Sequence, residues 1–331
     1  MRHLFLALTG LLLSASMAAA NCTGRDLWPV YSEAFRTSLE KSVSRDVYSD
    51  GRFFRVEKNG KTSHLFGTMH SAPTGKLRIP KAVLNEIRGS KNLLVEVAEP
   101  VSEAFFKDMD RNISLFFTKS PNNFYTRFAP TDWSFVTRVA KARGFPDGAV
   151  FYARPWYIYQ MINSLGCGRR PGETEIMDAK IENLARRANV SVTSLETPVE
   201  VIRAMDSFSE RDFATMTQAE LYGLSQTKPG DLAKTRLNMY LRADIQLIWK
   251  LQLTQYNGFP DKRATRLLNK LWEDQMLGVR NRAWMPAITK AVNEGDAFIA
   301  VGALHLGGKH GIVRALARKG YKVTRLKFVF R

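Results

Sequence analysis

Cysteine and histidine are scarce in this chain. Its 331 residues include only two cysteines, Cys22 and Cys167, and five histidines. Two cysteines so far apart do not supply the closely spaced ligand pairs of a structural zinc site, so that class of site is excluded. No apolar run approaches the ~20 residues that a membrane-spanning helix needs. The sequence therefore predicts a protein without a membrane span.

The first 20 residues are predicted to be a removable signal peptide. Arg2 and His3 form a short polar start, residues 4–13 are mostly apolar, and residues 18–20 are small alanines that suit a cleavage site. We therefore expect an exported, periplasmic protein. Its mature part, residues 21–331, has no low-complexity linker and is expected to form a single domain.

The two cysteines are expected to form a disulfide between Cys22 and Cys167. An even number of cysteines in an exported chain favours pairing, and this bond would tie the mature N-terminus to the rest of the protein. The alternative is lipid attachment at Cys22. It is the weaker interpretation because Asn21 stands where a small residue is expected.

Positive charge dominates the composition. The chain has 49 lysines and arginines against 31 aspartates and glutamates, a formal net charge of +18. Such a charge can indicate a nucleic-acid partner, but export and the dispersed basic residues argue against one. A peptide or an anionic envelope substrate is the expected partner. A charge kept only for solubility explains the composition equally well.

The pattern of apolar residues predicts an α/β fold. Residues 53–57 and 63–66 are expected to form a hairpin around Asn59-Gly60, and further strands are expected at 93–97, 190–195, 297–301 and 321–326. The long segment between them has mainly helical signals. We therefore predict a central mixed sheet with flanking helices and a large helical insertion.

Two of the five histidines occur in matching contexts. Gly67-Thr68-Met69-His70 follows one predicted strand, and Gly302-Ala303-Leu304-His305 follows another. Open α/β sheets bind ligands at the carboxyl ends of their strands. Each Gly-x-x-His element is thus expected to bring a histidine to that edge of the sheet.

Glu96 lies in the apolar run 93–97, where an ionised carboxylate is costly unless it is paired or bound to a metal. With His70 and His305 it makes a suitable ligand set for a divalent transition metal, which would lower the pKa of bound water. Glu96 could instead act as a general base. The structural alternative is that Glu96 caps a helix or pairs with an arginine.

These elements resemble the TraB/GumN family. The resemblance rests on residues 65–70, 93–97 and 301–308, and on Asp178, Leu195-Glu196-Thr197 and Arg280-Asn281 with Trp284 nearby. That family is related to the Tiki proteins, which are described as metal-dependent proteases. Some bacterial members are named for polysaccharide production or for interference with peptide pheromones.

The resemblance implies a set of roles. His70, Glu96 and His305 would hold the metal, with Mn²⁺ or Co²⁺ favoured and Zn²⁺ also suited to the donor set. Glu96 or a metal-bound hydroxide would activate water, and Arg280 would stabilise the developing oxyanion. The catalytic residues would accordingly be Glu96, His70, His305 and Arg280.

Other polar residues are candidates for supporting roles. Arg78 and Asn281 are candidate substrate-binding residues, although a solvated loop arginine also explains Arg78. Asp178 and Glu196 are expected to orient the histidine ligands, and helix capping or ion pairing explains them equally well.

The first functional hypothesis is an exported metal-dependent hydrolase, specifically a Tiki-like peptidase. The second is a non-catalytic envelope protein that binds a peptide, a glycan or a metal complex. A third, an accessory role in polysaccharide production, rests on the names of family members alone.

Overall fold

The computed structural model describes residues 24–44, 48–70, 77–165, 176–328 and 330. The predicted signal peptide lies outside these residues, as do Cys22 and Cys167, so the leader and the disulfide stay predictions. Among the described residues, no helix has both the length and the apolar composition needed to cross a membrane.

The described chain contains one mixed sheet of six strands in the order β4-β3-β5-β2-β1-β6. Strands β4, β3, β5 and β2 run parallel, whereas β1 is antiparallel to both β2 and β6. The predicted α/β fold with a mixed sheet is thus confirmed. The strands are β1 (Phe53–Lys58), β2 (Lys61–Thr68), β3 (Asn92–Val95), β4 (Ser191–Ser194), β5 (Ala297–Gly302) and β6 (Lys322–Arg325).

The hairpin between β1 and β2 forms at the predicted turn. Asn59 and Gly60 have φ angles of 50° and 73°, so both occupy the left-handed region that a two-residue hairpin turn requires. Asparagine and glycine adopt this conformation at little cost. The turn sets the register, in which Lys58 pairs with Lys61 and Phe53 with Phe66.

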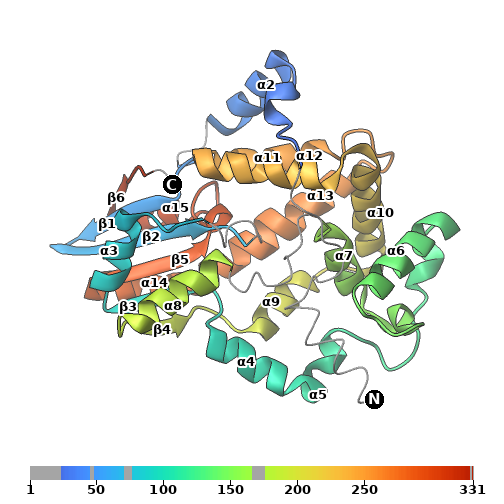
Figure 1. Ribbon diagram of the computed structural model, residues 1–331, viewed down its shortest axis with the longest axis horizontal. Coiled ribbons are helices and arrows are strands. Elements are labelled where there is room, and N and C mark those ends of the chain that lie inside the picture. Colours follow the sequence, from blue (N-terminus) through green and yellow to red (C-terminus); the bar gives the residue numbers. More distant parts are fainter. Residues whose placement is uncertain (1–23, 45–47, 71–76, 166–175, 329, 331) are drawn as a thin grey trace.

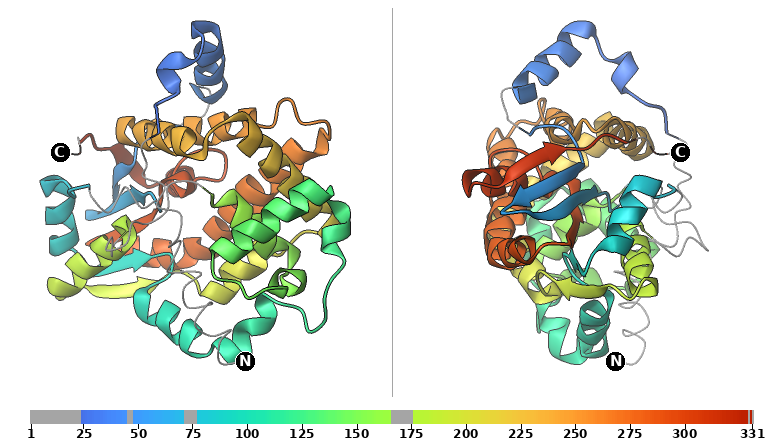
Figure 2. Two further views of the ribbon diagram at one scale, coloured as in Figure 1. Left: turned by 45° about the vertical axis from the view of Figure 1, so that its right-hand side comes forward. Right: turned by 90° about the vertical axis from the view of Figure 1, so that its left-hand side faces the viewer.

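Helices cover both faces of the sheet (Figures 1 and 2). Successive residues of a strand point to opposite faces, and the cores follow this rule. Phe298 packs in the core beneath α3 and α8, whereas Ile299 packs in the core beneath α14 and α15. The covering helices are α3 (Lys81–Gly89) and α8 (Met177–Arg187) on one face, and α14 (Arg280–Glu294) and α15 (Ile312–Arg318) on the other.

The segment between β3 and β5 is mostly helical, as predicted, and builds a separate helical lobe beside the sheet (Figure 1). We define the helical lobe as α4–α7, α9, α10 and α13. The described chain also contains α2 (Glu33–Ser44), α4 (Glu99–Lys107), α5 (Met109–Asn112), α6 (Pro130–Ala142), α7 (Pro155–Asn163), α9 (Pro198–Met205), α10 (Glu210–Gln226), α11 (Pro229–Arg242), α12 (Ile245–Thr254), α13 (Arg263–Asn269), η1 (Trp28–Val30), η3 (Ile113–Leu115), η4 (Phe124–Arg127), η5 (Ala149–Tyr152), the π-helix η6 (Lys270–Val279) and η7 (Ala303–His305).

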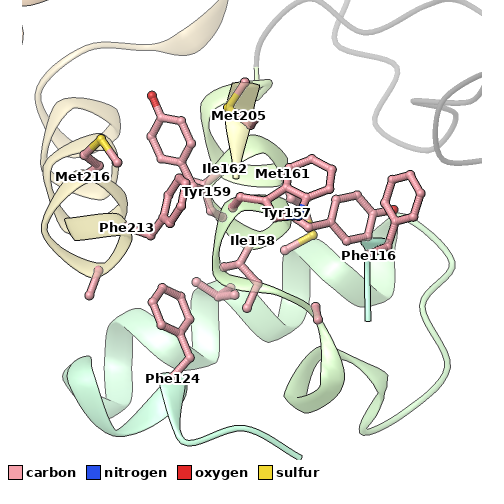
Figure 3. Packing of buried hydrophobic residues seen from close by; sticks show 14 of the residues in the cluster. Phe116, Phe124, Tyr157, Ile158, Tyr159, Met161, Ile162, Met205, Phe213 and Met216 are labelled. Carbon is pink, nitrogen blue, oxygen red and sulfur yellow. The ribbon is translucent and has the colours of Figure 1, made fainter. Parts of the chain in front are cut away.

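The helical lobe has its own aromatic core (Figure 3). Helix α7 lies at its centre and extends side chains to opposite sides. Its Tyr157 ring lies 5.1 Å from the ring of Phe116, and its Tyr159 ring lies 6.0 Å from the ring of Phe213 on α10. Large, rigid aromatic side chains bury much apolar surface, so this lobe does not depend on the sheet for a core.

A buried carboxyl group interrupts this apolar core. Glu220 on α10 accepts a 2.7 Å hydrogen bond from the hydroxyl of Tyr256 and a longer one, 3.5 Å, from the hydroxyl of Tyr159. Burial raises the pKa of Glu220 to about 7, although hydrogen bonds from both tyrosines and the charge of Arg236 oppose the rise. The carboxyl group is therefore protonated in weakly acidic solution.

This shift gives a pH-dependent stability. The pKa of Glu220 is about 7 in the folded protein and 4.5 for an ordinary glutamate, so between these pH values the folded state holds a proton that the unfolded state has lost. The free energy of unfolding should therefore fall by roughly 3 kcal/mol as the pH rises through that window. Chemical unfolding of wild type and Glu220→Gln across this pH range tests this. The stability difference between the two proteins should change by that amount; parallel profiles would contradict it.

Candidate functional site

The four parallel strands bring four polar residues to one edge of the sheet. His70 follows β2, Glu96 follows β3, Glu196 follows β4 and His305 follows β5. The carboxyl ends of parallel strands meet at the same edge, which is where open α/β sheets place their ligands. One expectation changes in detail: Glu96 was predicted within a strand ending at Val97, but β3 ends at Val95, so Glu96 lies just beyond the strand.

His70 is held through one ring nitrogen and presents the other to Glu96. Its Nδ1 lies 2.9 Å from Oδ2 of Asp178, in the first turn of α8, and Thr68 donates a 2.5 Å hydrogen bond to the other oxygen of that carboxylate. Its Nε2 lies 3.3 Å from Oε1 of Glu96. Asp178 and then Glu96 raise the pKa of His70 well above its ordinary value, outweighing desolvation.

Of the two histidines that follow Gly67 and Gly302, His70 is the one accessible to solvent. Its side chain is 50% exposed, whereas that of His305 is 5% exposed. The half-exposed ring therefore marks the side from which a ligand from solution reaches the site.

His305 is buried and its tautomer is fixed by Asn281. The amide nitrogen of Asn281 donates to the carbonyl oxygens of His305 and His310, at 3.0 and 2.8 Å. Its amide oxygen therefore faces Nδ1 of His305, 2.6 Å away, and accepts a hydrogen bond from the ring N–H there. This leaves the lone pair on Nε2. Burial lowers the pKa of His305 to about 3, despite the opposing charge of Glu96, so the ring is neutral.

Glu96 connects the two histidines. Its Oε1 accepts a 2.7 Å hydrogen bond from the backbone N–H of Gly302 and lies 3.3 Å from Nε2 of His70 and 3.8 Å from Nε2 of His305. Its Oε2 accepts from Nη2 of Arg280 at 2.7 Å. Burial raises the pKa of Glu96, but His70, His305 and Arg280 together hold it well below its usual range.

Gly302 explains how these groups come so close. A Cβ atom at this position would lie 3.0 Å from Nε2 of His70 and 3.2 Å from Oε1 of Glu96. Those separations are tighter than ordinary side-chain contacts, so a side chain here would push the two groups apart. The glycine of the second Gly-x-x-His element thus serves the site by its lack of a side chain as well as by its N–H group.

Arg280 is the first residue of α14 and follows the π-helix η6 directly. A guanidinium has five N–H donors, and the contacts of Arg280 account for all of them. Nε donates to Glu196, Nη1 to the carbonyl oxygen of Met276 and to Nε2 of His305, and Nη2 to Glu96 and Glu196. The distance from Nη1 to Nε2 of His305 is 3.3 Å.

Glu196 anchors this arginine. Both of its oxygens lie 3.0 Å from Nε of Arg280, and Nε1 of Trp284 donates to one of them at 3.2 Å. Burial raises the pKa of Glu196 despite these contacts, whereas the same contacts raise the pKa of Arg280 despite its burial. Because both oxygens accept from the guanidinium, the geometry supports an ionised pair.

Three acceptor atoms therefore converge: Oε1 of Glu96 and the Nε2 atoms of His70 and His305. When both Nδ1 atoms hold their protons on Asp178 and Asn281, no proton remains between these three acceptors. Arg280 donates to Nε2 of His305 and Gly302 to Oε1 of Glu96. The contact between Oε1 of Glu96 and Nε2 of His70 is therefore the one that needs a proton on His70 or a metal ion.

Metal bond lengths of about 2.0–2.2 Å place neighbouring tetrahedral donors roughly 3.3–3.6 Å apart. The separation of His70 Nε2 from Glu96 Oε1 is 3.3 Å. The separation for His305 Nε2 is longer, 3.8 Å. Across the described residues, no group of three or more histidine, cysteine, aspartate and glutamate side chains has the geometry to hold a metal ion. The donor chemistry fits a divalent metal, and its assembly requires His305 and Glu96 to approach each other.

Most residues predicted from the sequence meet at this site. His70, Glu96, Asp178, Glu196, Arg280, Asn281 and His305 are linked by the contacts described above. None of those contacts involves Arg78, which is exposed in the coil before α3. Asn281 is only 3% exposed and its amide is engaged with protein groups. Its environment is that of a residue that orients His305, in place of the expected substrate contact.

Three contributions to the site were not predicted. They are the hydroxyl of Thr68, the backbone N–H of Gly302 and the carbonyl oxygen of Met276. Thr68 and Gly302 belong to the two Gly-x-x-His elements, so their positions in the sequence carried a usable signal. Met276 acts through its backbone, and its side chain gives no indication of this role.

Comparison with known proteins supports one relationship. A search of curated proteins finds no match to this sequence. A model of the TraB/PrgY/gumN family matches residues 53–325, a range that begins with β1, ends with β6 and includes every residue of the site described above. The chain therefore belongs to the TraB/PrgY/gumN family.

Proposed function

We propose that the protein is an exported metal-dependent hydrolase, with peptides as its substrate class. The observation that carries the proposal is the convergence of Oε1 of Glu96 with the Nε2 atoms of His70 and His305. Two imidazoles and one carboxylate are a ligand set that divalent transition metals favour. We propose Mn²⁺ or Co²⁺, with Zn²⁺ also compatible with the donors.

The surrounding residues prepare both histidines for this role. Metal-ligating histidines commonly donate their second ring N–H to a carboxylate or carbonyl oxygen, which fixes the tautomer. Asp178 has this position for His70, and the amide oxygen of Asn281 has it for His305. Both Nε2 atoms thereby point toward Glu96. In the metal-free protein, the proton that His70 gains takes the place of the ion.

The metal, when bound, would supply a water molecule of lowered pKa and polarise a carbonyl group. The electrostatics favour Glu96 as a ligand over Glu96 as a general base, because its depressed pKa makes it a weak proton acceptor. The N–H groups of Arg280 are engaged with protein acceptors. Stabilising an oxyanion would therefore require one of these bonds to break, and holding Glu96 is the role that its contacts support.

Peptides are proposed as substrates on the resemblance given in the sequence analysis, which relates the TraB/GumN family to the Tiki proteins, described as metal-dependent proteases. The half-exposed ring of His70 provides access for such a substrate. We also propose that the protein acts in the periplasm after removal of residues 1–20.

Metal analysis and hydrolysis assays on the purified protein test this function together. We expect stoichiometric divalent metal and cleavage of a peptide library, with both lost in His70→Ala and cleavage lost on chelation and restored by Mn²⁺ or Co²⁺. Metal binding without any turnover would favour a non-catalytic binding protein. A folded protein that binds no divalent metal would rule the proposal out.

A further inference from the structure

We infer that Arg280 competes with the metal ion for Nε2 of His305. While the site is metal-free, Arg280 donates a hydrogen bond to the lone pair of this atom, and it must give up that contact when the ion binds. The inference rests on the proposed function and names the residue that sets metal affinity at the same site. It follows from where the guanidinium lies among the proposed ligands.

Arg280 contacts two of the three proposed ligands. Its Nη1 lies 3.3 Å from Nε2 of His305, and its Nη2 lies 2.7 Å from Oε2 of Glu96. Nδ1 of His305 holds its proton against Asn281, so Nε2 has a single lone pair. That lone pair can accept a hydrogen bond from Arg280 or coordinate a metal ion. It cannot do both, because each needs the same direction in the ring plane.

The competition accounts for the arrangement of the site. No ready ligand triad exists among the described side chains, and the longest separation within the proposed set is the 3.8 Å between His305 and Glu96. These are the two ligands that Arg280 contacts. Its positive charge takes part of the electrostatic role that a divalent ion would have.

Glu196 controls how strongly Arg280 competes. It forms a buried ion pair with the guanidinium, and the carbonyl oxygen of Met276 also accepts from Nη1, so the arginine has partners to retain when it releases His305. With Glu196 ionised, the Arg280–Glu196 pair adds no net charge to the site. Removing either member should therefore shift metal affinity, and the two shifts should have opposite signs.

Isothermal titration of metal-stripped protein with Co²⁺ tests the inference without any activity assay. Arg280→Met removes the competing donor and its charge and should tighten Co²⁺ binding at least about tenfold. Glu196→Gln keeps Arg280 but removes its counter-charge and should weaken binding by a similar factor. Opposite shifts cannot arise from a general loss of folding, because both substitutions disturb the same buried pair.

The double variant Arg280→Met/Glu196→Gln removes both charges and replaces Arg280→Met in the test if that single variant does not fold. It too should bind Co²⁺ more tightly than wild type. Binding by Arg280→Met but not by wild type would also support the inference. If wild type binds Co²⁺ and removal of Arg280 leaves affinity unchanged or weaker, the inference fails while the proposed function stands. If no version binds Co²⁺, both fail.

Discussion

Replacing Glu96 with glutamine is expected to lower the affinity for divalent metal by at least about a hundredfold. Loss of a group that merely orients a ligand commonly costs 10–100-fold, and Glu96 is proposed to be a ligand itself. Glutamine has nearly the same shape but no charge, so it cannot replace the anionic oxygen that faces both histidines. Peptide hydrolysis should disappear together with the metal.

The same substitution should leave the fold largely intact. Arg280 keeps its ion pair with Glu196, and an amide oxygen at position 96 can still accept from Gly302. Glu99→Gln provides a matched control, because Glu99 is exposed at the start of α4 and also loses one negative charge. Titration of both variants with Mn²⁺ or Co²⁺ measures the effect. Equal affinities for the two variants would contradict the role given to Glu96.

Replacing Arg280 with methionine is expected to lower the free energy of unfolding of the metal-free protein by about 3–5 kcal/mol. Breaking a buried ion pair from one side leaves an unpaired buried charge, and that is the usual size of the cost. Here Arg280 and Glu196 are each 7% exposed, so solvent offers the remaining carboxylate little compensation.

The double variant Arg280→Met/Glu196→Gln should recover much of that loss. A glutamine at position 196 carries no charge and can still accept from Nε1 of Trp284, which contacts Glu196 at 3.2 Å. A double-mutant cycle measured by chemical unfolding should give a coupling free energy of about 2–3 kcal/mol. Additive effects of the two substitutions would show that the pair does not act as a unit.

The sequence was informative wherever a local conformation decides the structure. Asn59-Gly60 predicts the hairpin because few other residue pairs adopt two left-handed conformations in succession. Gly67 and Gly302 were predicted to follow their strands; they are instead the next-to-last residue of β2 and the last residue of β5, so each still marks a strand end closely enough to bring its histidine to the same edge of the sheet. These features depend on neighbours in the chain, so they can be recognised without a structure.

Contacts between distant segments were beyond the reach of sequence patterns. Glu196 and Arg280 are separated by 84 positions, and only folding shows that they form one buried pair. Asn281 was recognised as a candidate residue, but its role depends on the carbonyl oxygens of His305 and His310, which are not visible in its own motif. The order of the strands likewise depends on tertiary packing.

The central claim is that His70, Glu96 and His305 bind one divalent metal ion. Anomalous diffraction from crystals of the protein grown with Mn²⁺, recorded at the manganese absorption edge, tests it most directly. We expect a single strong peak within bonding distance of Oε1 of Glu96 and the Nε2 atoms of both histidines, with Arg280 withdrawn from His305. A saturated crystal with no peak among these three atoms, or with its peak elsewhere, would contradict the account.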